Sequence, residues 1–420
     1  MRRLRLIIND THVASLTDQN GIWALEYTNK WIESPTSYDL CPDLSRSAGK
    51  IMDGSSVRPV QWFFDNLLPE EQSRDLLAAD AKIDKADAFS LLSHYGAESA
   101  GAITLLNSLE VIPEGGMQPL PDEALSERIR NLPRVSLATG APKRMSLAGA
   151  QHKLPVVVKD GTLYEPVGSQ PSTHILKPNH ENVDHFDNSV ANEWFVMTLA
   201  RRAKLNVPAV HMRRVPDPVY LIERFDRTTE GDQIQRLHVL DACQLLTLDR
   251  HYKYELATME TLNRVIEFCR RKGDARIQLF KWLVFNILVG NNDSHLKNLS
   301  FYVTPNGYEL APHYDLLCTA IYSRSEDDPT PWLNADMTWK VENMNTFGDV
   351  TRERVLYMGT CVGLTTRIAG KLIDEIVSLT IAAASDLLVY TQKESLAGEH
   401  RLLRRIVHGV IRDMGARLVA

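Results

Sequence analysis

The stretch from Phe285 to Asp315, "FNILVGNNDSHLKNLSFYVTPNGYELAPHYD", decides how the rest of the chain is interpreted. It begins as a strongly apolar run, which predicts the end of a buried helix. The polar loop "NNDSHLKN" follows, and an Asn-Gly pair between apolar runs then predicts a β-hairpin. Because a hairpin brings its two ends together, we expect Asp315 to lie close to Asp293 and Asn298.

This grouping of an amide with two carboxylates suits phosphoryl transfer. Asp293 and Asn298 have the D-x-x-x-x-N spacing in which kinases place a catalytic base and a metal-binding amide. Mg²⁺ prefers oxygen ligands, so Asn298 and Asp315 are candidate metal ligands. We expect Asp293 to take the proton of the attacking hydroxyl and Lys297 to neutralise charge on the transferred group. His295 would contact phosphate or Asp315.

Three other parts of a phosphoryl-transfer site occur upstream in the expected order. The bend "SLAGAQHK" has a glycine and two alanines that allow its backbone N–H groups to approach phosphates. Lys177 ends the strand "THILK", and Glu193 borders an apolar helical face, where a carboxylate needs a cationic partner. The segment "LIERFDR" would present backbone groups to adenine.

Each of these patterns also has a simpler explanation. The polar loop could merely cap a helix and a hairpin, and the bend could be an ordinary turn. Lys177 could lie along the surface with its ammonium in water, and Glu193 could be a surface residue. The shared order of all the parts favours the kinase interpretation.

Composition limits the class of protein. A chain of 420 residues predicts two or three domains, and a net charge of −6 argues against general adhesion to nucleic acid or anionic membranes. The five scattered cysteines predict free thiols. The first residues lack the length of a signal peptide, and no window reaches the span of a membrane helix, which predicts a cytoplasmic protein.

The order of the patterns predicts an α+β chain with three parts. Residues 1–110 are expected to form a small N-terminal α+β subdomain, and residues 111–228 a β-rich lobe with the phosphate loop and the lysine. Residues 229–420 are expected to form a mostly helical lobe with the catalytic loop and the metal site.

With these residues placed, the sequence resembles the HipA family of serine/threonine kinases, which are toxins of type II toxin–antitoxin pairs. The resemblance rests on "SLAGAQHK", "THILKP", "NEWFVMTLA", "LIERFDR", "DACQLL", "GNNDSHLKNLSF" and "LAPHYD". The stretches "VQWFFDNLLPE" and "LLSHYGAESAGAI" also resemble the family's N-terminal domain. The resemblance implies a two-lobed, protein-kinase-like fold with a β-rich N-lobe, an appended small N-terminal subdomain and a helical C-lobe.

The resemblance also implies a role for each matching residue. Asp293 is implied as the catalytic base, with Lys297 beside it, and Asn298 and Asp315 as the ligands of Mg²⁺. Ser146 matches a serine that such kinases autophosphorylate. The implied ATP-binding residues are Ala148, Gly149, Ala150, Gln151, His152, Lys153, Lys177, Glu193, Glu223, Arg224, Phe225, His295, Leu296, Asn298, Tyr314 and Asp315. The family loop often has Glu where His152 stands, so this position departs from the family pattern.

The resemblance implies an ATP- and Mg²⁺-dependent toxin that arrests growth by phosphorylating a translation component such as an aminoacyl-tRNA synthetase. It also implies a helix-turn-helix antitoxin partner that links the kinase to operator DNA, with no membrane partner. Two other functions stay open. One is a metal-dependent phosphoesterase using Asp293, His295, His313 and Asp315, and the other is a catalytically silent corepressor.

Overall fold

The chain folds into two compact units, each built from separate stretches of sequence. The computed structural model describes the chain apart from residues 108–109, 112, 146, 231–232 and 326. Unit 1 contains Met1–Pro178, Arg213–Tyr252 and Ser300–Ala311, and unit 2 contains Asn179–Met212, Lys253–Leu299 and Pro312–Ala420. No helix among the described residues is long and apolar enough to cross a membrane.

The first sheet of unit 1 comes from the N-terminal residues. Its strands are β1 (Arg2–Ile8), β2 (Thr11–Gln19), β3 (Ile22–Tyr27), β4 (Lys50–Met52) and β5 (Ile103–Asn107), in the order β4-β3-β2-β1-β5. The chain passes from β2 to β3 through Asn20 and Gly21, both with positive φ, which is the backbone that tight hairpin turns require. The short apolar runs Leu4–Ile8 and Ile22–Tyr27 thus lie in antiparallel strands.

The second sheet of unit 1 carries two of the predicted ATP-binding segments. Its strands are β6 (Gly116–Pro119), β7 (Leu154–Lys159), β8 (Thr162–Val167), β9 (His174–Pro178), β10 (Val210–Arg214) and β11 (Pro218–Glu223). Their order is β10-β11-β9-β7-β8-β6, with the central strands antiparallel. Unit 1 also contains the ribbon β12 (Arg227–Glu230) and β13 (Gln233–Arg236), and the sheet of β14 (Val239–Asp241), β15 (Ser300–Thr304) and β16 (Gly307–Leu310).

Short helices accompany these sheets. They are α1 (Asn29–Ile32), α2 (Pro59–Asp65), α3 (Glu71–Ala81), α4 (Ala88–Tyr95), α5 (Asp122–Arg130) and α7 (Ala242–Leu245), with the 3₁₀ turns η1 (Arg46–Ala48) and η2 (Arg250–Tyr252). Helix α4 begins where the Asp87 carboxylate accepts a hydrogen bond from the Ser90 N–H, and Gly96 follows its last residue.

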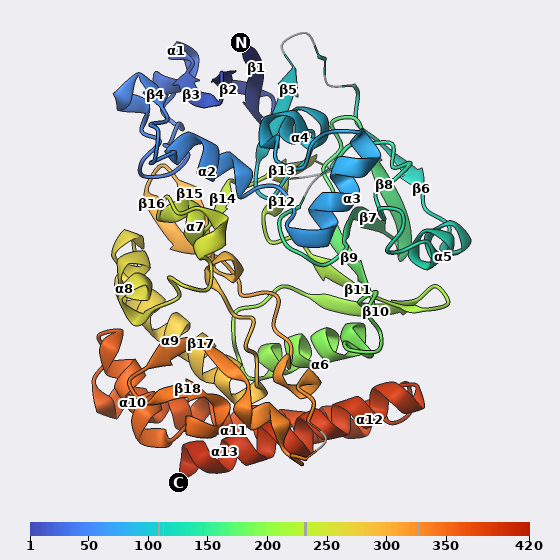
Figure 1. Cartoon of the computed structure of the whole chain (residues 1–420), viewed down its shortest axis with the longest axis vertical. Coiled ribbons are helices and arrows are strands. Elements are labelled where there is room, and N and C mark those ends of the chain that lie inside the picture. Colours follow the sequence, from blue (N-terminus) through green and yellow to red (C-terminus); the bar gives the residue numbers. More distant parts are fainter. Residues whose placement is uncertain (108–109, 112, 146, 231–232, 326) are drawn as a thin grey trace. The chain divides into compact units, whose positions relative to one another are not determined.

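Unit 2 is mostly helical. Its helices are α6 (Ser189–Arg202), α8 (Met259–Phe268), α9 (Lys272–Val289), α10 (Arg352–Cys361), α11 (Thr366–Thr391), α12 (Ala397–Arg405), the π-helical turn η7 (Ile406–Ile411) and α13 (Arg412–Val419). The 3₁₀ turns are η3 (Leu296–Asn298), η4 (Ala320–Tyr322), η5 (Pro331–Asn334) and η6 (Phe347–Asp349), and β17 (Asp336–Val341) pairs with β18 (Met344–Thr346). Helix α11 packs against α6, α9, α10 and α13 (Figure 1).

The element order confirms the predicted α+β class, β-rich first and helical later. The predicted hairpin is also confirmed, because β15 pairs with β16 around Pro305 and Asn306. Strand β16 ends at Leu310, so the residues that lead to Asp315 continue without regular secondary structure. The domain limits at residues 110 and 228 stay predictions.

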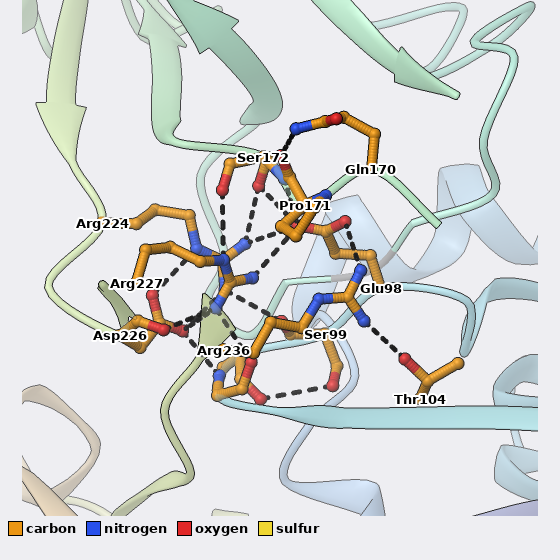
Figure 2. Close-up of polar contacts among 12 residues, drawn as sticks. Glu98, Ser99, Thr104, Gln170, Pro171, Ser172, Arg224, Asp226, Arg227 and Arg236 are labelled. Atoms are coloured by element: carbon orange, nitrogen blue, oxygen red, sulfur yellow. Dashed lines mark hydrogen bonds and ion pairs between the residues drawn. The ribbon is translucent and has the colours of Figure 1, made fainter. Parts of the chain in front are cut away.

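A buried group of charges joins the N-terminal residues of unit 1 to its later strands (Figure 2). Glu98 is 0% exposed, and its Oε2 lies 2.7 Å from Lys143 Nζ and 3.3 Å from Arg236 Nη2. The other oxygen, Oε1, lies 3.2 Å from Arg224 Nη1 and 3.1 Å from Arg227 Nη2. We call these five residues, together with Asp226, the Glu98 cluster.

The second carboxylate of the Glu98 cluster holds the same arginines from another side. Arg224 donates to Asp226 with Nε at 3.0 Å and Nη2 at 2.7 Å, and the Gly101 N–H donates at 2.7 Å. Burial would raise the pKa of Asp226, but Arg224 and Arg227 lower it to about 2. Burial would likewise raise the pKa of Glu98, and the surrounding cations hold it well below its usual range. Both carboxylates are therefore ionised.

We predict that Glu98→Gln strongly destabilises unit 1. The substitution keeps the size of the side chain but leaves four buried cations with one carboxylate, and breaking a buried ion pair typically costs about 3–5 kcal/mol. Urea unfolding followed by tryptophan fluorescence and circular dichroism measures the loss. The matched control is Glu267→Gln, which removes an exposed pair with Lys272. An unfolding midpoint that shifts equally in both variants would contradict the prediction.

Candidate active site

The predicted catalytic loop of unit 2 follows helix α9, whose second half is largely apolar and buried. The helix ends where Gly290 adopts φ +69°, a left-handed conformation that favours glycine. A Cβ on Gly290 would lie 2.9 Å from the Val410 side chain. A residue with a side chain would therefore both strain the backbone and crowd Val410 at this helix end.

A chain of amide side chains holds this loop in one conformation. Asn286 in α9 donates to the Trp282 carbonyl at 2.8 Å and accepts from Asn291 Nδ2 at 2.7 Å. Asn291 Oδ1 in turn accepts the Asp293 N–H at 3.1 Å. Asn298 Nδ2 then donates to the Asp293 carbonyl at 2.8 Å, which closes the loop on itself. The two residues of the D-x-x-x-x-N pattern are thus brought together.

The two predicted carboxylates are partly accessible, whereas much of the surrounding region is buried. Asp293 and Asp315 are half-exposed, whereas Asn291, Lys297 and Asn298 are buried. The Tyr254 hydroxyl donates to the Asp293 carboxylate. A proton acceptor in a kinase must reach the substrate hydroxyl, so this pattern of exposure fits the predicted role of Asp293.

The segment after the hairpin returns to the catalytic loop. The Tyr314 hydroxyl donates to the Lys297 carbonyl at 2.8 Å, which places Tyr314 against the loop. The next residue, Asp315, has φ +58°, a backbone conformation that a non-glycine residue rarely adopts. Such strained positions persist where the surroundings hold them, and they concentrate at functional sites.

The donor set fits Mg²⁺. The nitrogen of the Asn298 amide is occupied by the Asp293 carbonyl, so Asn298 Oδ1 is the atom that could bind a cation. The Asp315 carboxylate adds a charged oxygen, and Mg²⁺ commonly takes one or two protein ligands with the rest from phosphates and water. Among the described residues, no group of three or more His, Cys, Asp and Glu side chains is arranged to hold a metal.

His313 is built into the core of unit 2. It is 3% exposed and stacks on Trp282 with ring centroids 5.8 Å apart. Burial lowers the pKa of His313 to about 3, so its ring is neutral at physiological pH. These contacts give His313 a structural role and argue against the phosphoesterase that the sequence left open.

The predicted phosphate loop lies in unit 1 and rests on the N-terminal helices. Gly149 has φ +111°, and Lys153 Nζ donates across it to the Ala148 carbonyl at 2.7 Å. The Gly149 carbonyl accepts the Glu70 N–H at 3.2 Å, and the Ser73 hydroxyl donates to the Ala150 carbonyl. The sequence predicted the bend but gave no signal for these contacts with α3.

The other predicted residues of unit 1 lie on the second sheet. Lys177 is buried on β9, opposite Tyr220 of β11, with its Nζ 5.7 Å from the Tyr220 ring centroid. Glu223 ends β11 with an exposed side chain, and Gln151 donates to the Pro178 carbonyl at 3.3 Å. His152 is buried, with its Nδ1 3.5 Å from the Ser73 hydroxyl.

The segment "LIERFDR", which was predicted to contact adenine, continues into the Glu98 cluster. The Arg224 N–H donates to the Thr173 carbonyl at 2.9 Å while its side chain enters the cluster. The Phe225 carbonyl accepts the Tyr302 hydroxyl at 2.9 Å. Sequence reasoning placed Arg224 and Phe225 at adenine but missed the cluster, because its members are far apart in the sequence.

Three predicted features stay predictions. Glu193 is buried on α6 in unit 2, and Lys177 belongs to unit 1, so the predicted pair stays untested. The same holds for the roles of His295 and Leu296, both of which are buried in the loop. Ser146 lies outside the described residues.

Comparison with known proteins identifies the family. The model of the HipA-like C-terminal domain matches residues 145–384, and that of the HipA N-terminal domain matches residues 4–106. The chain belongs to the HipA family. A relative from Sinorhizobium fredii, named "Putative kinase Y4mE", is 33% identical over 413 residues, covering 92% of this chain and 94% of the relative.

A second relative has a more specific name. The serine/threonine-protein kinase toxin HipA of Shewanella oneidensis is 31% identical over 326 residues, which cover 72% of each chain. Among solved structures, a chain from the complex of Shewanella oneidensis HipA, HipB and operator DNA is similar with a TM-score of 0.82 and 23% identity, covering 99% of this chain and 97% of that one. The kinase-like fold is thereby confirmed, and this HipA-family chain is a protein kinase.

We predict that Gly149→Ala lowers ATP affinity while Gly140→Ala does not. Both glycines have positive φ, so both substitutions carry backbone strain of about 1–3 kcal/mol. A Cβ at Gly149 would lie 2.5 Å from Lys153 Nζ and would push that side chain off the loop, whereas a Cβ at Gly140 meets nothing within 4 Å. Equilibrium binding of a fluorescent ATP analogue measures the effect. Equal losses of affinity in the two variants would show that the loop geometry is irrelevant to ATP.

Proposed function

We propose that this HipA-family chain is an ATP- and Mg²⁺-dependent serine/threonine kinase that acts as a growth-arresting toxin. The observation that carries the proposal is the catalytic loop, in which the Asn298 amide is fixed to the Asp293 carbonyl at 2.8 Å beside an accessible Asp293 carboxylate. The family membership and the strained backbone of Asp315 also support the proposal.

In the proposed reaction, the side chains of the chain position both reactants. Asp293 accepts the proton of the substrate serine or threonine hydroxyl. The oxygen of that hydroxyl attacks the γ-phosphorus of ATP, and the bond from this phosphorus to ADP breaks. Lys177 and the backbone of the Ala148–Lys153 loop bind the phosphates, and Lys297 faces the charge of the transferred group. Asn298 and Asp315 would hold Mg²⁺, which would supply further neutralisation of the phosphates.

The partners are proposed from the family. One is a small helix-turn-helix antitoxin of the HipB type, which would link the kinase to operator DNA, since the structurally similar chain comes from a complex with HipB and DNA. The substrate is proposed to be a translation component such as an aminoacyl-tRNA synthetase. Phosphorylating such an enzyme would stop charging of its tRNA and so arrest growth in the cytoplasm.

We predict that Asp293→Asn and Asp315→Ala each reduce phosphate transfer by about 10²-fold or more, the usual contribution of a catalytic group. Asp293→Asn should still bind ATP, because Asn298 and Asp315 keep the metal. Labelled ATP incubated with the protein and a cell lysate measures transfer and identifies the substrate. The control is Asp336→Asn, which changes an exposed carboxylate of unit 2. Transfer above about a tenth of wild type in either site variant would refute the assigned roles.

The same variant separates a toxic kinase from a toxic binding protein. Expression of the wild-type chain alone should arrest growth, and Asp293→Asn should relieve the arrest at equal protein level. An arrest that persists in Asp293→Asn would favour the corepressor, which acts by binding alone.

We predict that the kinase modifies Ser146 and is switched off by it. A phosphoserine adds about −1.5 to −2 charges next to the loop proposed to bind the anionic phosphates of ATP, and like charges repel. Mass spectrometry of wild type and Asp293→Asn, both held with Mg²⁺ and ATP, should find phosphate at Ser146 only in the wild type. Unmodified Ser146 in active enzyme would exclude this form of regulation.

A further inference from the structure

Unit 2 contains a cavity that none of the predicted site residues lines. Its volume is about 690 Å³, within the range of small-molecule sites. One wall is formed by α12 and η7, and the facing wall by Ile321 and the segment Pro329–Trp332. Trp332 is 5% exposed, so the floor of the cavity is firm and largely apolar.

The helical wall is a stripe of positive charge. Arg401, Arg404, Arg405 and His408 all line the cavity, and their spacing places them along one helical face. Like charges three and four residues apart on a helix repel, so this arrangement costs stability unless an anion offsets it. No Asp or Glu is among the described residues that line the cavity.

The arginines of the stripe are available to a ligand. Arg401 and Arg404 are exposed, and within the described part of the chain neither makes a hydrogen bond or an ion pair. Arg405 donates one nitrogen, Nη2, to the Ile321 carbonyl at 3.3 Å, which holds its guanidinium at the cavity. Burial lowers the pKa of His408, and Arg412 and Arg404 lower it further. This shift favours the neutral ring of His408, so the positive charge of the wall comes from its three arginines.

We propose that this cavity binds a small phosphorylated molecule, with its phosphate groups on Arg401, Arg404 and Arg405 and its apolar part against Pro331 and Trp332. Guanidinium groups bind phosphate oxygens through paired, charge-assisted hydrogen bonds, which explains three arginines on one wall. A volume of about 690 Å³ is that of a site for a small molecule of nucleotide size. The π-helical turn η7 fits this assignment, because such turns often occur at functional sites.

The test uses inorganic pyrophosphate as the probe, titrated into the full chain by isothermal calorimetry. Every sample contains Mg²⁺ and a saturating non-hydrolysable ATP analogue, so that the proposed nucleotide site is filled. Wild type should bind pyrophosphate saturably at one site. The double variant Arg401→Gln and Arg404→Gln should weaken binding at least about tenfold, because two charge-assisted contacts are lost.

The matched control is Arg264→Gln with Arg367→Gln, which removes the same charge from exposed positions of α8 and α11. It should leave pyrophosphate affinity within about twofold, well under the tenfold change that 1.4 kcal/mol produces. Circular dichroism verifies that both double variants are folded. Equal weakening in both, or no saturable binding in wild type, would overturn the proposal. So would a DNA duplex that binds through Arg401 and Arg404 when pyrophosphate does not. None of these readouts requires kinase activity.

Discussion

Glu98 has no exposure to solvent, and it accepts contacts from a lysine and three arginines that are distant from it in sequence. The fold of unit 1 depends on this arrangement, because a carboxylate cannot be buried without partners and four cations cannot be buried without carboxylates. Arg224 connects the Glu98 cluster to the segment proposed to contact adenine. The backbone of Arg224 lies in that segment, and its guanidinium binds both Glu98 and Asp226. The segment Leu221–Arg227 is thus held by apolar packing of Leu221 at its first end and by buried charges from Arg224 onward.

The docking of the phosphate loop on α3 extends the same principle. Glu70 and Ser73 hold the backbone of Gly149 and Ala150, so residues near the N-terminus set the position of a loop that would bind ATP. This gives a physical reason for an N-terminal subdomain in a kinase of this family, beyond any role in partner binding. In unit 2, the hydrogen bond between Asn286 and Asn291 likewise attaches the predicted catalytic loop to helix α9.

Local signals in the sequence predicted much of this structure. The apolar run before Gly290 is the end of a buried helix as expected, and the turn at Pro305 and Asn306 joins β15 to β16. The contact of Asn298 with Asp293 follows from their close spacing. By contrast, the Glu98 cluster and the packing of His313 on Trp282 depend on side chains brought together by tertiary structure. No period or spacing encodes such contacts, so a single sequence could not reveal them.

The discontinuity of unit 1 has a consequence for how the chain is made. Glu98 and Arg236 are 138 residues apart, and strands β15 and β16 come later still. At ribosomal speeds of about 5–20 residues per second, roughly 7–28 s separate the synthesis of this glutamate from that of its last cationic partner. During that interval the N-terminal strands are exposed without the charges that complete their unit. A nascent chain therefore lacks the last cationic partner of Glu98 until well after its proposed phosphate loop has been synthesised.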